Sequence, residues 1–66
     1  MPETPRKLAL RHVIAGRRRI LAVQREHMKE LIAQRKDARA AQSLLIRYER
    51  SLAIFEDELN RLEREQ

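Results

Sequence analysis

The chain has 66 residues, with 15 Lys and Arg against 10 Asp and Glu, one Gly, two Pro and no Cys. So short a chain forms at most one small domain and cannot build the walls of a deep active-site cleft, so we expect neither an enzyme nor a cofactor. The absence of cysteine excludes a disulfide framework and a thiolate metal site.

A first helix is predicted over residues 5–35. Thr4 is a favourable N-cap, and Pro5 at the first helical position loses no hydrogen bond because that N–H has no intrahelical partner. After this start only Gly16 interrupts the helical pattern. Spacings of three, four and seven residues place an apolar stripe on one face of this helix. The stripe consists of Leu10, Ile14, Leu21, Met28 and Leu31.

Polar residues lie on the same line as this stripe, namely Arg17, Gln24 and Arg35. The stripe of the first helix is therefore only partly apolar. Gln24 has two interpretations, a solvated edge residue or a buried polar residue that fixes the register of a coiled coil.

A turn is predicted at residues 36–37, although neither Gly nor Pro marks it. The carboxylate of Asp37 suits the N-cap of a second helix. The apolar line slips by three residues here, which indicates either a break between two helices or a coiled-coil stammer within one long helix.

The second predicted helix, over residues 38–64, has a regular heptad pattern. Apolar residues alternate spacings of three and four for more than three repeats, which favours coiled-coil packing. They are Ala38, Ala41, Leu45, Tyr48, Leu52, Phe55, Leu59 and Leu62.

Charge distinguishes the two interpretations of the joint. Residues 1–36 hold ten Lys and Arg and three Asp and Glu, hence +7, whereas residues 37–66 hold five and seven, hence −2. Folding at the turn brings residues 17–19 beside residues 56–58, and Lys7 and Arg11 towards Glu63 and Glu65. An antiparallel homodimer of long helices would satisfy the same charges. We favour a single all-α domain, an antiparallel two-helix hairpin.

Several short segments on either side of the turn carry a resemblance: Arg18-Arg19-Ile20 with Gln24, then Asp37, Leu44-Leu45 and Glu49-Arg50-Ser51-Leu52. Over residues 11–62 the chain resembles a family of short, uncharacterised bacterial proteins. Those relatives commonly have Gly just before the turn Asp, where this chain has Lys36. The resemblance implies a helical hairpin and implies no activity and no site residues.

Few residues suggest chemistry. His12 and His27 are too far apart for a helical metal pair, so we expect no metal site. A basic cluster, Arg17, Arg18 and Arg19, is the sharpest alternative, because such a helix can neutralise nucleic-acid phosphates. The neighbouring acidic segment and the scarcity of aromatic residues for base stacking argue against it.

Surplus apolar residues point to a protein partner. Val23 on the first helix and Ile46 and Ile54 on the second lie off the heptad line, and two helices have no third layer to cover them. We therefore expect an interaction module that forms a four-helix bundle by dimerisation or docks on a helical partner. The predicted interface consists of Leu45, Tyr48, Leu52, Phe55, Leu59, Leu62, Ile46, Ile54 and Val23.

A membrane location is not expected, since the apolar runs are far shorter than the ~18–20 residues of a spanning helix. The basic N-terminus is not followed by the apolar segment of a secretory signal. The sequence therefore predicts a cytoplasmic protein.

Overall fold

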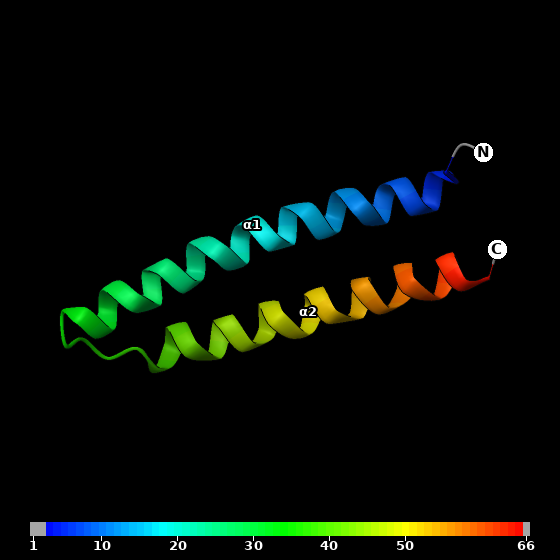
Figure 1. Ribbon diagram of the computed structural model, residues 1–66. Helices are drawn as coiled ribbons and strands as arrows, with labels where there is room; N and C mark the ends of the chain where they lie inside the picture. Colours follow the sequence, from blue (N-terminus) through cyan, green and yellow to red (C-terminus); the bar gives the residue numbers. More distant parts are fainter. Residues whose placement is uncertain (1–2, 66) are drawn as a thin grey trace.

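The protein is a hairpin of two long helices. The computed structural model describes residues 3–65, so residues 1, 2 and 66 of the predicted domain lie outside it. Helices α1 (Pro5–Ala33) and α2 (Arg39–Arg64) lie side by side in opposite directions (Figure 1). The described residues contain no strand, and the hairpin measures 51 × 15 × 12 Å. The all-α hairpin is confirmed, and a single continuous helix is excluded.

The start of α1 follows the prediction. Thr4 is the N-cap in an extended conformation, with φ −64° and ψ 152°, and its hydroxyl accepts the backbone N–H of Lys7 at 3.3 Å. Pro5 is the first helical residue. This arrangement satisfies one of the N–H groups that have no partner within the helix.

The turn differs from the prediction, because α1 ends at Ala33 rather than at residue 35 and α2 begins at Arg39 rather than at residue 38. The cause is a Schellman motif, in which the Lys36 N–H donates to the Leu31 carbonyl at 2.8 Å and the Arg35 N–H to the Ile32 carbonyl at 3.0 Å. Arg35 has φ 56°, a left-handed conformation that is usually taken by glycine. Arg35 is thus exposed in the turn and does not continue the apolar stripe.

Asp37 caps the start of α2 with its carboxylate, as predicted, but it lies one residue before the N-cap, the position that the prediction gave it. Ala38 occupies the N-cap and provides no side-chain hydrogen bond. The Asp37 carboxylate accepts the backbone N–H of Arg39 at 3.0 Å and also binds the Arg39 guanidinium at 2.8 Å. These hydrogen bonds, first those from the guanidinium and then that from the backbone, lower the pKa of Asp37.

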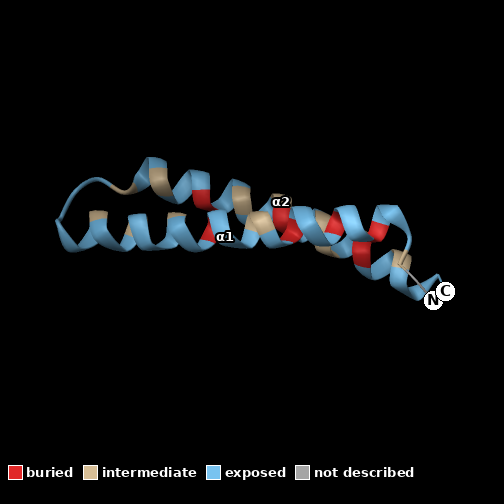
Figure 2. Ribbon diagram, turned by 90° about the horizontal axis from the view of Figure 1, so that it is seen from above, coloured by how far each residue is buried: buried red, intermediate tan, exposed pale blue. Residues whose placement is uncertain are grey.

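A heptad seam joins the two helices, and every one of its positions is buried or half-buried. On α2 it consists of the eight predicted residues, Ala38, Ala41, Leu45, Tyr48, Leu52, Phe55, Leu59 and Leu62. On α1 it consists of Lys7, Leu10, Ile14, Arg17, Leu21, Gln24, Met28 and Leu31. Figure 2 shows the buried residues along the contact between the helices and away from the turn. The coiled-coil spacing of the sequence therefore defines the interior of one hairpin.

Candidate interaction surface

The predicted interface residues are divided between the seam and the outer surface of the hairpin. Six of them belong to the seam: Leu45, Leu52 and Leu59 are buried, and Tyr48, Phe55 and Leu62 pack against that core. Their main contacts are therefore made within one chain. Val23, Ile46 and Ile54 are the exposed members of the predicted interface, so these three are the ones placed to contact a partner.

Arg17 and Gln24 are polar residues of the α1 seam, and they differ in how they contact α2. Arg17 places its guanidinium carbon 5.5 Å from the centroid of the Phe55 ring, a cation–π contact. Gln24 is half-buried. No buried side-chain nitrogen or oxygen in residues 3–65 lacks a hydrogen-bond partner, so the Gln24 amide is not sealed away from water. This position supports the interpretation of Gln24 as an edge residue.

Lys7 is a seam residue that the sequence interpretation missed. It was expected to face Glu63 and Glu65, yet only 5% of its surface is exposed and it lies on the core side of α1. The signal was present, because Lys7 precedes Ile14 and Leu21 at intervals of seven. A lysine at such a position buries its hydrocarbon stem and directs its ammonium group towards the surface.

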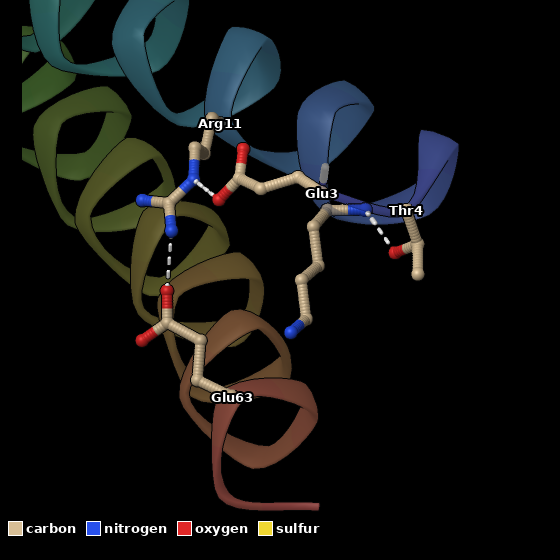
Figure 3. A network of polar contacts seen from close by, with 5 residues as sticks. Glu3, Thr4, Arg11 and Glu63 are labelled. Carbon is tan, nitrogen blue, oxygen red and sulfur yellow. Dashed lines mark hydrogen bonds and ion pairs between the residues drawn. The ribbon is translucent and has the colours of Figure 1, made fainter. Parts of the chain in front are cut away.

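A charged flank, defined by Arg11, Arg18, Glu56 and Glu63, covers one side of the seam. Arg11 Nη2 lies 2.6 Å from Glu63 Oε1, and Arg18 Nη2 lies 3.0 Å from Glu56 Oε2. Figure 3 shows Arg11 between Glu63 of α2 and Glu3, whose Oε1 is 2.5 Å from Arg11 Nε. The hydrogen bond to Glu3 is the main cause of the raised pKa of Arg11.

These contacts test the predicted charge pairing residue by residue. Arg18–Glu56 and Arg11–Glu63 confirm the expected approach of the basic and acidic segments. Arg17 instead packs on Phe55, and Arg19 forms no ion pair within residues 3–65. The basic triplet of α1 thus points in three directions.

Arg6 and Glu58 form one further pair between the helices, on the side of the seam opposite the charged flank. Their hydrogen bond raises the pKa of Arg6 and lowers the pKa of Glu58. This pair ties the first turn of α1 to α2.

An apolar flank lies on this same side, opposite the charged flank. Each step along an α-helix rotates the side chain by about 100°, so a residue one position before a seam residue points to this side of the seam. The apolar flank is defined by Val13, Ile20 and Val23 of α1 and Leu44 and Ile54 of α2, all of them exposed. Val23 and Ile54 are the most open, at 64% and 66% exposure.

Ile46 does not join the apolar flank. It lies eight residues from Ile54, so the two side chains diverge by about 80° around α2. Ile46 therefore points to the side of the charged flank, although it is also exposed. Both isoleucines belong to one predicted interface, whereas in the hairpin they lean towards different flanks.

The surface offers little for small-molecule chemistry. Residues 3–65 contain no group of three His, Asp or Glu side chains that could hold a metal ion. The most enclosed groove, about 230 Å³ on the charged flank and lined by Arg11, Arg18, Glu56 and Asn60 among others, is smaller than the ~300–1,000 Å³ of typical ligand pockets. Two larger hollows, of about 450 and 410 Å³, are shallow and open to solvent. The exposed apolar residues are therefore the main unexplained feature.

Comparison of the chain with models of known protein families, with curated proteins and with solved structures gave no match. The resemblance to short bacterial proteins of unknown function stays a prediction. Within residues 3–65, neither helix combines the length and apolarity that crossing a bilayer requires.

Proposed function

We propose that this protein is a non-catalytic helical interaction module that associates with a second copy of itself, so that two hairpins form a four-helix bundle. The observation that carries the proposal is the number of large apolar side chains left outside the seam. Within residues 3–65, eight large apolar side chains are exposed, five of them together on the apolar flank, whereas six apolar side chains are buried. Contiguous exposed apolar surface is typical of interaction sites.

The total surface area supports the same conclusion. The chain exposes 5482 Å². A compact monomer of 7.9 kDa is expected to expose about 4,400 Å². The excess, about 1,000 Å² per chain, is close to the ~800 Å² that each partner contributes to a stable interface of ordinary size.

The depth of the core also favours association. The most buried apolar side chains, Ile14 and Leu21, still expose 4% of their surface. A single-layer core of this kind supplies no more than ~3–5 kcal/mol of stability in a chain of this size. Packing two hairpins at a crossing angle of ~20° converts one layer into a two-layer core.

Sedimentation equilibrium and thermal unfolding of the full chain test the proposal. We expect a mass of twice 7.9 kDa and a Tm that rises with protein concentration, because association stabilises only the folded state. A folded monomer whose Tm does not depend on concentration would contradict it. Docking on a different helical protein would then be the remaining form of an interaction module.

Nucleic-acid binding through Arg17, Arg18 and Arg19 is the second candidate, and it rests on the excess of basic residues on α1. Its support is weaker, because Arg17 contacts Phe55 and Arg18 pairs with Glu56. Binding to duplex DNA or RNA that weakens steeply with salt, and that is lost when the three arginines are replaced by alanine, would favour this function over the interaction module.

The proposed location is the cytoplasm. The fold is held by a heptad seam and by ion pairs, with no cysteine in the chain, so a reducing compartment would not weaken it. Fractionation of cells that express the tagged full chain would test this location.

A further inference from the structure

We propose that two copies join through their apolar flanks, with α1 of each copy against α2 of the other, about a two-fold axis parallel to the helices. In this arrangement Ile54 of one copy packs into a shallow hollow on α1 of the other. The inference rests on the proposed self-association and adds the face, the helix pairing and the register.

The choice of face follows from what each flank would bury. The charged flank holds two ion pairs between the helices, Arg11–Glu63 and Arg18–Glu56, whereas the side of the apolar flank holds one, Arg6–Glu58, and removing such pairs from water is costly. The apolar flank holds five of the eight exposed large apolar side chains. At its centre lie Ile20, Val23 and Ile54, whose transfer from water into a contact with a second copy is favourable.

The pairing of helices follows from charge. A two-fold axis allows either α1 against α2 of the partner or α1 against α1. Helix α1 contains eight Lys and Arg and two Asp and Glu, hence +6, whereas α2 contains five and five, hence zero. Placing two helices of +6 in contact is unfavourable, so α1 packs against the neutral α2.

The register follows from the hairpin itself. In three of the four contacts of charged side chains between the helices, Arg11–Glu63, Arg18–Glu56 and Arg17–Phe55, the residue numbers add up to between 72 and 74, which we take as the sum for residues at one height. The fourth contact, Arg6–Glu58, adds up to 64, because these two long side chains extend along the helices to meet. A two-fold axis parallel to the helices leaves heights unchanged. Ile54 of the partner therefore lies at the height of residues 18–20 on α1, with Arg19 in the middle.

A hollow is present on α1 at this height. It has a volume of about 250 Å³ and is lined by Arg19, Ile20, Val23 and Gln24. Helical side chains lean towards the N-terminus of their own helix, which moves the partner's Ile54 from the height of Arg19 towards the middle of the hollow. Gly16, one turn away, leaves open space around its Cα, which lets a second helix approach closely.

Charged residues at the rim are complementary in this register. Arg19 and Asp57 are exposed, and neither forms an ion pair within residues 3–65. On adjacent helices Arg19 lies about three residues, or ~4.5 Å, from the height of the partner's Asp57. By the same offset Glu26 lies near the partner's Arg50. Both pairs have opposite charges, which favours this pairing over others.

Two matched substitutions on α2 test the face. Ile54→Glu places a charge in the proposed contact, whereas Ile46→Glu places the same charge on the opposite flank of the same helix. Both residues are exposed in the hairpin, so both variants are expected to keep its helical circular dichroism. Sedimentation should show that Ile54→Glu is monomeric and Ile46→Glu remains dimeric. A dimeric Ile54→Glu, or a monomeric Ile46→Glu, would overturn the proposed face.

Cross-linking tests the pairing of helices, since the chain has no cysteine of its own. Chains with Arg19→Cys are mixed with chains with Asp57→Cys and treated with a short thiol-specific cross-linker. We expect covalent dimers from the mixture and none from either variant alone. Covalent dimers from one variant alone would place like helices together and overturn the arrangement. Both outcomes require a dimer, so they differ from a monomeric wild-type chain, which would contradict the proposed function itself.

Discussion

The half of the hairpin near the chain ends and the half near the turn are built differently. No residue between 22 and 44 is buried, whereas Lys7, Leu10, Ile14 and Leu59 all lie in the half near the ends. All three ion pairs between the helices in the described residues also lie there, since their α1 members are residues 6, 11 and 18. Near the turn, the ion pairs join residues two or three positions apart.

This difference shows that the covalent connection at the turn and the contacts between side chains serve the same purpose, which is to hold the two helices together. At the turn the backbone keeps the two helices together, so half-buried residues such as Met28, Leu31 and Ala41 are sufficient. At the other end no covalent link joins them, and each contact must offset the entropy of holding two free helix ends together. Packing and charge are therefore concentrated where the connection is most distant.

The largest expected effect comes from truncating one seam residue in each half. Ile14→Ala should cost about 2–4 kcal/mol because the side chain is 4% exposed and leaves a cavity, whereas Met28→Ala should cost about 1 kcal/mol because it is only half-buried. Urea unfolding at one fixed protein concentration measures both. Equal losses would show that the two halves contribute equally and that the comparison is wrong.

A smaller effect is expected at the turn. Arg35→Gly should stabilise the hairpin by about 1 kcal/mol, because glycine adopts a φ of 56° without the steric cost that arginine has. Lys36→Gly is the matched control, since Lys36 does not have a positive φ, and it should give no gain. The Tm of both variants measures this effect. If only Lys36→Gly raised the Tm, the left-handed residue of the turn would be Lys36, and the assignment to Arg35 would be wrong.

The smallest effect concerns pH. The hydrogen bond from Arg6 lowers the pKa of Glu58, so this pair stabilises the fold at neutral pH and loses its contribution as pH falls through the folded-state pKa. Acidification should therefore lower the protection factors of the backbone amides in the first turns of α1, that is, their resistance to hydrogen exchange relative to the intrinsic exchange rate at each pH. Glu58→Gln should reduce that acid response, while Asp37→Asn, which removes the carboxylate beside Arg39 at the turn, should leave it intact. An identical response in both variants would contradict a local role for Glu58.

Much of the fold could be predicted because it depends on local signals. Thr4 and Pro5 mark the start of α1 by backbone chemistry alone, and the α2 heptads from Leu45 to Leu62 leave one face for the core. The opposite charges of the two halves identified the approach of Arg11 to Glu63 and of Arg18 to Glu56. These features depend on spacing and sign, which a sequence contains directly.

The remaining features depend on tertiary context. The position of the turn is set by Arg35, which adopts a left-handed backbone conformation. For an arginine this conformation costs only ~1 kcal/mol, so no glycine is required there and the sequence does not indicate the position. Lys7 can be buried because a lysine side chain is amphipathic, with an apolar stem and a charged end. Its charge predicts a surface position, whereas its heptad spacing predicts a core position, and the sequence does not show which of the two prevails. Ile46 and Ile54 could be assigned to different sides of α2 only after the Arg18–Glu56 contact had shown where the charged flank lies.

The antiparallel path brings Pro5 and Arg64 to the same end of the hairpin (Figure 1). A segment joined to either helix end would therefore leave the molecule from one place, and the turn would stand at the far end of a rod 51 Å long. The hairpin is thus suited to tethering from a single point, with its turn and both flanks projecting clear of whatever holds it.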